Sequence, residues 1–118
     1  MMDPYLPLTT TEQLEWGNPV VDTHIHSLIK RYSPVENLSK ETLKSTDIWI
    51  TAGLEDERVP LSQSLNYTQK LRRLSTDSHG QLVLYLSDRA HTHDAHISKE
   101  LHELSLELSF LLHSLSIK

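Results

Sequence analysis

The chain has 118 residues, of which 37% are hydrophobic and 23% are charged, and its formal net charge is −5. This composition is typical of a globular domain, and the acidic balance excludes a nucleic-acid surface, which would be basic. No apolar run reaches the roughly 20 residues that span a bilayer, no signal peptide is recognisable, and the absence of cysteine excludes disulfides and suits a cytoplasmic location.

The first 46 residues predict helical pieces and no strand. Over residues 9–16, Thr10 or Thr11 can cap a short helix that carries Glu12 and Glu15 in its first turns. Gly-Asn-Pro at 17–19 ends it. Residues 20–32 predict a second helix, whose apolar face comprises Val21, Ile25, Leu28 and Tyr32. A polar connection is expected over residues 35–46.

The remaining residues predict two strands and two helices. Residues 47–53 and 81–87 are apolar runs without polar alternation, as in strands that are buried on both faces. An amphipathic helix is expected between them over 61–74, with a turn at 77–80. A last helix is expected over 97–116. Its apolar residues recur at helical spacing: Ile97, Leu101, Leu104, Leu108, Leu111, Leu112 and Leu115.

The order strand-helix-strand-helix predicts an α/β fold with parallel strands and flanking helices. Two strands alone cannot form a stable parallel sheet that is covered on both faces. We therefore expect the chain to be part of a larger α/β unit. We also expect it to self-associate, or to bind a partner chain that supplies the remaining strands, because exposed edges and apolar patches promote association.

Two histidine-rich stretches, residues 20–26 and 88–96, suggest metal binding. On a helix, however, His24 and His26 point about 200° apart and cannot share a metal. The second stretch follows a strand, where open α/β sheets bind their ligands, so a single acting histidine is the better interpretation. The alternatives are solvated histidines on a helix and an incidental polar loop.

Charged residues gather where the first strand ends, and Asp56 is among them. The carboxyl ends of parallel strands meet at one edge of a sheet, so Asp56 and His93 are expected on neighbouring loops. An acid followed by a histidine is two-thirds of a Ser-His-Asp triad in the chain order of α/β-hydrolases. The alternative is a set of charged residues that cap the next helix.

Four segments together resemble the C-terminal part of the catalytic domain of the prolyl oligopeptidase family, in the branch of oligopeptidase B and the prolyl endopeptidase-like proteins. They are residues 1–19, 30–37, 50–61 and 67–74. The resemblance implies a serine peptidase domain of α/β-hydrolase fold that cuts peptides rather than intact proteins and needs no cofactor.

The resemblance also implies roles for single residues. Asp56 matches the triad aspartate of the family, and His93 falls where the family has its triad histidine. The family usually flanks that histidine with glycine, whereas this sequence has Thr92 and Asp94. His91 is therefore the alternative triad histidine.

Two further residues match substrate-binding positions. Arg58 matches an arginine that binds the substrate backbone, and Glu12 matches an acid that recognises a basic side chain beside the scissile bond. The second acid of that pair is expected two residues later, where this sequence has Leu14.

The nucleophilic serine of the family lies in a Gly-x-Ser-x-Gly motif, and none of the three glycines here belongs to one. We therefore expect residues 1–118 to form the C-terminal part of a peptidase domain, with the nucleophile, oxyanion hole and propeller upstream, and to be inactive alone. One alternative is a non-catalytic interaction protein with a partial hydrolase fold. Another is a metal-binding protein that uses its histidines, namely His24, His26, His91, His93 and His96.

Overall fold

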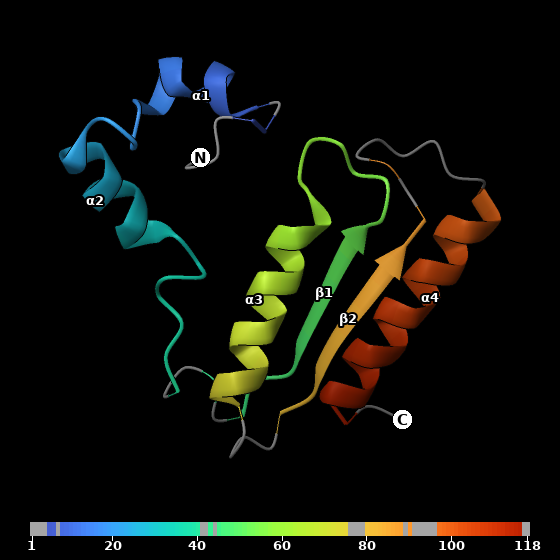
Figure 1. Ribbon diagram of the computed structural model, residues 1–118. Coiled ribbons are helices and arrows are strands. Elements are labelled where there is room, and N and C mark those ends of the chain that lie inside the picture. The colour runs from blue at the N-terminus through green and yellow to red at the C-terminus, as the bar shows by residue number, and fades with distance from the viewer. Residues whose placement is uncertain are drawn as a thin grey trace.

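The computed structural model describes residues 5–6, 8–40, 43, 45–75, 80–88, 90 and 97–116. Its elements follow the predicted order (Figure 1). They are α1 (Thr9–Trp16), α2 (Thr23–Tyr32), β1 (Ile48–Gly53), α3 (Leu61–Leu74), β2 (Leu82–Ser87) and α4 (Ile97–Ser114).

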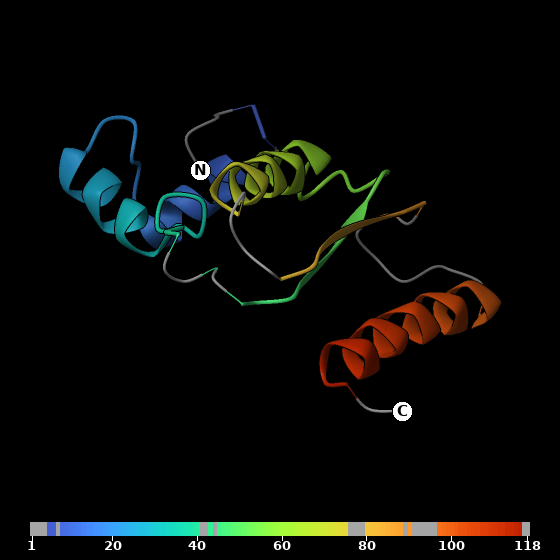
Figure 2. The same ribbon diagram turned by 90° about the horizontal axis from the view of Figure 1, so that it is seen from below.

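The two strands form a parallel sheet in which Ile48 pairs with Leu82 and Gly53 pairs with Ser87. Helix α3 lies on one face of this sheet and α4 on the other, as Figure 2 shows most clearly. The result is a partial α/β fold in three layers, as the sequence predicts. Because side chains alternate along a strand, each strand sends every second residue toward one of the two helices.

Helix α3 packs on β1, and one face of this helix contains Leu71 and Thr68, which are the most buried side chains described. The hydroxyl of Thr68 donates a 2.7 Å hydrogen bond to the carbonyl oxygen of Ser64, so it can be buried without losing a partner. Leu65, which the sequence places on the apolar face, is 37% exposed.

Helix α4 contacts the other face of the sheet. The ring of Trp49 stacks on Tyr85 at 5.8 Å between centroids and meets Phe110 of α4 at 5.4 Å. The hydroxyl of Thr51 donates a 3.3 Å hydrogen bond to Glu107. Aromatic and polar residues of α4 therefore contact the sheet, whereas five of the six leucines of this helix are exposed.

The strands start in close contact. The N–H of Ile48 donates to the carbonyl oxygen of Gln81 at 2.8 Å, and the N–H of Gln81 donates to the Asp47 carboxylate at 2.6 Å. This second bond holds the pKa of Asp47 below its ordinary value. A Cβ atom at Gly80 would lie 2.2 Å from the carbonyl oxygen of Thr46. Glycine at position 80 therefore permits the approach that sets the register.

The helices before the sheet begin at residues other than those predicted. Helix α1 starts at Thr9, and Leu8 stands at its N-cap without a side-chain hydrogen bond, so the caps predicted at Thr10 and Thr11 are wrong. Helix α2 starts at Thr23 rather than at position 20. Asp22 is its N-cap and accepts hydrogen bonds from the backbone N–H groups of His24 and Ile25 at 2.8 and 3.2 Å.

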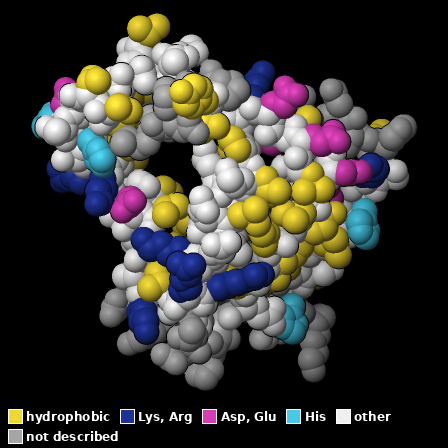
Figure 3. Space-filling model, in the orientation of Figure 1, with side chains coloured by type: hydrophobic (Ala, Val, Ile, Leu, Met, Phe, Trp, Pro, Cys, Tyr) yellow, Lys and Arg dark blue, Asp and Glu magenta, His cyan; other side chains and the backbone are white. Residues whose placement is uncertain are grey.

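The fold is open for its size. Its radius of gyration is 16.9 Å, against about 13.5 Å for a compact domain of this length. Most strand residues are only half-buried, so the prediction of strands buried on both faces is wrong. The reason is that neither strand has a second neighbour among the described residues. Hydrophobic side chains gather on the surface beside α3 (Figure 3).

Among the described helices, none combines the length and the apolar character needed to cross a membrane.

Candidate active site

The loop after β1 carries two of the predicted site residues. Asp56 follows the end of the strand, and its Oδ1 atom accepts hydrogen bonds from the backbone N–H groups of Arg58 and Val59, both at 2.9 Å. An aspartate that bonds to the backbone two and three residues ahead fixes the course of a turn. The structure thus brings Asp56, which is half-buried, together with Arg58, which is exposed, in one ordered turn.

The end of β2 lies beside this loop. The N–H of Leu54 donates a 2.8 Å hydrogen bond to the carbonyl oxygen of Ser87, the last residue of β2. The loop with Asp56 and the segment that follows Ser87 therefore start from one point on the carboxyl edge of the sheet. The predicted triad histidine, His93, and its alternative, His91, lie outside the described residues, so their distances to Asp56 stay untested.

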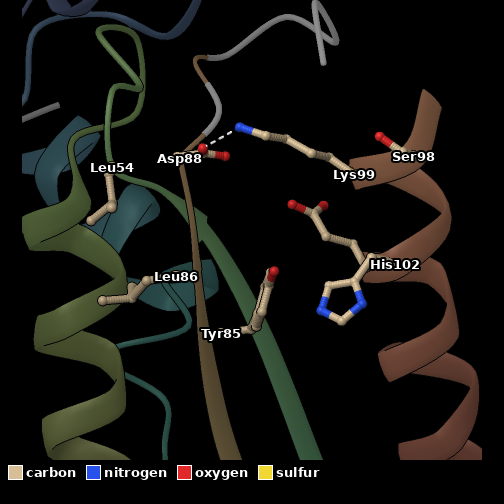
Figure 4. A pocket seen from close by; sticks show the side chains of 8 residues that line it. Leu54, Tyr85, Leu86, Asp88, Ser98, Lys99 and His102 are labelled. Carbon is tan, nitrogen blue, oxygen red and sulfur yellow. Dashed lines mark hydrogen bonds and ion pairs between the residues drawn. The ribbon is translucent and has the colours of Figure 1, made fainter. Parts of the chain in front are cut away.

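A cavity of about 410 Å³ lies between the end of β2 and the first turns of α4 (Figure 4). Figure 4 shows Lys99 of α4 reaching across to Asp88, with which it forms an ion pair. The other residues that line the cavity are Leu54, Tyr85, Leu86, Ser98, His102 and Glu103.

Glu103 is a buried carboxylate of this cavity. Its Oε1 atom accepts a 2.6 Å hydrogen bond from the hydroxyl of Ser87, and both residues are at least 95% buried. The pairs Ser87–Glu103 and Asp88–Lys99 thus connect the end of β2 with the start of α4, on either side of the stretch that contains His93 in the sequence.

Sequence reasoning missed this cavity. Asp88 directly follows β2, and Lys99 and Glu103 lie on α4 among leucines, where Glu103 has the same local pattern as the solvated glutamates of any amphipathic helix. Only the packing of α4 on β2 distinguishes Glu103 from those solvated glutamates.

Glu12, the predicted specificity residue, lies on α1. Figure 1 shows this helix beyond the carboxyl ends of the strands, on the side of the molecule where the loop after β1 also lies. The side chains of Glu12 and Arg58 form no ion pair with each other in the described structure. Leu14, which stands where a second acid is expected, is 92% exposed. The structure therefore leaves Glu12 on a separate element from Asp56 and Arg58.

The histidines on α2, His24 and His26, are exposed. Within the described ranges, no group of three or more histidine, aspartate or glutamate side chains is arranged to hold a metal ion. The second histidine-rich stretch, with His91, His93 and His96, falls outside those ranges.

Comparison with known proteins places these features in context. The family model described as "Prolyl oligopeptidase family" matches residues 1–118. The chain is 44% identical over 77 residues to "Prolyl endopeptidase-like" of Gallus gallus, a match that covers 65% of this chain and 10% of the relative. It is 49% identical over 72 residues to "Prolyl endopeptidase-like" of Homo sapiens, covering 61% of the chain and 10% of the relative.

A bacterial relative matches over the whole chain. "Protease 2" of Moraxella lacunata is 28% identical over 118 residues, which is 100% of this chain and 17% of the relative. The matched region thus spans between a tenth and about a sixth of the length of these three relatives.

Proposed function

The chain belongs to the prolyl oligopeptidase family, whose members are serine peptidases of α/β-hydrolase fold, and we propose that it supplies the C-terminal part of such a peptidase's catalytic domain. One observation carries the proposal. The strands are parallel, and the N–H of Leu54 donates a hydrogen bond to Ser87 at their carboxyl ends. The loop that contains Asp56 and the segment that leads to His93 therefore begin at the same edge of the sheet. That arrangement favours a shared role for an acid and a histidine.

In the proposed mechanism, an upstream part of the domain provides the nucleophilic serine. His93 takes the proton of this serine as general base, and Asp56 accepts a hydrogen bond from the imidazole. The carboxylate fixes the tautomer of the ring and stabilises the imidazolium that forms. The backbone N–H groups of Arg58 and Val59 hold the Asp56 carboxylate in position for this task.

Two residues are proposed to bind the peptide substrate. Arg58 is exposed in the same turn as Asp56, so its guanidinium can donate to carbonyl oxygens of a peptide backbone near the triad. Glu12 offers a carboxylate to a basic side chain beside the scissile bond. We propose on this basis a preference for Arg or Lys, with one acid in place of two because Leu14 stands at the second position.

The proposal includes inactivity of the chain by itself. A general base needs a nucleophile to activate, and this sequence has no Gly-x-Ser-x-Gly motif. We expect no hydrolysis of peptide amides by the isolated chain. Turnover that a serine-directed phosphonate blocks would contradict the proposal.

The decisive experiment joins this chain to the upstream part of the human prolyl endopeptidase-like relative, which restores a complete domain. The hybrid is assayed with short ester and amide substrates of Arg and Lys. We expect activity in the hybrid, none in its His93→Ala variant, and near-normal activity in the matched His91→Ala variant. Loss of activity in His91→Ala alone would identify His91, rather than His93, as the triad histidine. Full activity in both variants would refute the triad.

A second candidate function is a non-catalytic interaction protein with a partial hydrolase fold. The observation in its favour is the large number of exposed leucines among the described residues, twelve in all, of which five lie on α4. An inactive hybrid together with a stable complex between the chain and another protein would favour this candidate.

A further inference from the structure

Ser87 links three elements at the carboxyl end of β2. Its carbonyl oxygen accepts a 2.8 Å hydrogen bond from the N–H of Leu54, the residue that starts the loop with Asp56. Its hydroxyl donates a 2.6 Å hydrogen bond to the carboxylate of Glu103 on α4. Through one residue, the loop after β1 and the start of the segment after β2 are therefore connected to helix α4.

The bond between Ser87 and Glu103 lies inside the protein. Ser87 is 3% exposed and Glu103 is 5% exposed. A hydrogen bond to an ionised carboxylate is shorter than one between neutral groups and about twice as strong, and a low local dielectric strengthens it further. Because a hydrogen bond is directional, this bond fixes where α4 lies along β2 as well as how closely it approaches.

Stability alone does not require a carboxylate at this place. Removing a charged group from water is costly, and apolar side chains of similar volume often replace buried charged groups without loss of stability. Leu54 and Leu86 line the same cavity as Glu103, so a leucine at position 103 would have apolar neighbours. A leucine would fill the space, but it would not hold Ser87 in one orientation.

A second hydroxyl–carboxylate bond on α4 provides a comparison. Glu107, one helical turn along from Glu103, accepts a 3.3 Å hydrogen bond from the hydroxyl of Thr51 in the middle of β1. Thr51 is exposed, so water can take the place of this bond at little cost. The two glutamates contact the sheet through the same chemistry, but the bond of Glu103 is the buried one and lies at the carboxyl edge.

We propose that Glu103 is a positioning residue that acts through Ser87 on the loop with Asp56 and on the start of the segment that leads to His93. This inference rests on the proposed peptidase function. In that mechanism Asp56 accepts a hydrogen bond from the imidazole, so the two segments have to keep a fixed spacing. A misplacement of about 1 Å can cost about 100-fold in rate. Glu103 contacts no reacting atom; it holds the residue at which both segments begin.

The variant that tests this role removes both partners. Ser87→Ala combined with Glu103→Leu, here called the double variant, leaves no buried polar group behind, so the free energy of unfolding should stay close to that of the wild type. Glu103→Gln is the conservative variant, because its amide oxygen can still accept from the Ser87 hydroxyl. Glu107→Leu is the matched control, since it removes the exposed bond on the same helix.

The first measurement needs no activity. Amide hydrogen exchange in the 118-residue chain follows the N–H of Leu54, which donates to Ser87. We expect this N–H to exchange about tenfold faster in the double variant, because local opening of the strand end becomes easier. The conservative and control variants should keep the wild-type rate. The N–H of Ile48, which donates to Gln81 at the opposite end of the sheet, is the internal reference and should not change.

The second measurement uses the active hybrid. We expect the double variant to lower kcat about 10- to 100-fold with KM nearly unchanged, because the reacting groups lose alignment while the substrate is still bound. Glu103→Gln should restore most of the kcat, and Glu107→Leu should leave it unchanged. Titration of active sites with a serine-directed phosphonate gives kcat per folded enzyme. A merely structural role would lower the number of active sites and leave this kcat as it is.

The outcomes separate this proposal from the proposed function. An unchanged Leu54 exchange rate in the double variant would overturn it, and so would equal acceleration at Leu54 and Ile48, which indicates general destabilisation. An unchanged kcat per active site in the double variant would also overturn it. A parent hybrid without activity would contradict the peptidase function instead, and the exchange of Leu54 would still decide whether Glu103 fixes the start of this loop.

Discussion

The hydroxyl of Ser87 donates a 2.6 Å hydrogen bond to the Glu103 carboxylate, and both side chains are buried where β2 meets α4. The neighbouring residue, Asp88, pairs with Lys99 of the same helix. Two consecutive residues at the end of β2 are thus tied to the first turns of α4. These ties hold together the two ends of the stretch in which the predicted triad histidine falls.

We expect Ser87→Ala to destabilise the chain by about 1–3 kcal/mol, because a buried carboxylate then loses a hydrogen-bond donor. The loss is measured as the change in the free energy of unfolding, from urea titrations followed by circular dichroism. Asp88→Asn is the control: its ion pair is exposed, and such pairs contribute at most about 1 kcal/mol. A larger loss in Asp88→Asn than in Ser87→Ala would contradict this account.

Gly80→Ala should destabilise the sheet. The added methyl group would lie 2.2 Å from the carbonyl oxygen of Thr46, and a backbone atom cannot move away as a flexible side chain can. We expect a loss of about 1–3 kcal/mol, typical of overpacking. Urea titrations measure it against Ser62→Ala, an exposed position on α3. Unchanged stability in Gly80→Ala would mean that the strands start farther apart than described.

The stability of the chain should depend on the ionisation of Asp47. Its pKa is lowered from the ordinary value of 3.8, chiefly by the hydrogen bond from the N–H of Gln81. A carboxyl group whose pKa is lower in the folded state contributes stability above the pKa of the unfolded chain. That contribution is lost as the pH falls from the unfolded value through the folded one.

The matched variant is Asp47→Asn, which retains the acceptor oxygen and removes the charge. We expect the wild type to have the higher urea midpoint at neutral pH and the two midpoints to converge as the pH falls below about 4. Glu15→Gln, an exposed change on α1, controls for general charge effects. A constant difference down to acidic pH would show that the charge of Asp47 is not the cause.

Asp56 offers a way to separate a catalytic from a structural role. Asparagine at this position can still accept the hydrogen bonds from Arg58 and Val59, so Asp56→Asn should keep the turn. In the active hybrid we expect it to lower kcat by about 10⁴-fold, because it favours the wrong imidazole tautomer. Asp56→Ala, by contrast, removes the acceptor of both hydrogen bonds, so it should also increase proteolytic cleavage of the loop. Equal kcat in Asp56→Asn and the parent hybrid would exclude Asp56 from the triad.

Glu12→Gln should change specificity rather than catalysis. In the hybrid, we expect a higher KM for Arg and Lys substrates with kcat nearly unchanged, because the substitution removes a charge partner of the substrate. Substrates with an uncharged residue at that position should be unaffected. Glu15→Gln on the same helix is the matched control. Similar effects of both variants would assign the change to the overall charge of α1.

The sequence alone determined the elements and their order. The apolar runs, the helical spacing over 61–74 and 97–116, and the resemblance of four segments to one family predicted a parallel α/β arrangement, which the structure and the family match confirm. These features could be predicted because strand and helix periodicity and local turn residues are properties of neighbouring positions. The Asp56 and His93 roles stay predictions, since nothing described here measures the distance between them.

Only the tertiary structure decided which faces are buried. The leucines of α4 predicted a helix but not its orientation, and α4 turns Glu103, Glu107 and Phe110 to the sheet while five of its six leucines stay exposed. The burial of Glu103 depends on Ser87, which lies sixteen residues away in the sequence. A periodic pattern shows that a helix has two sides. Which side meets the sheet depends on the hydrogen bonds and ring contacts that distant residues offer once the strands are paired.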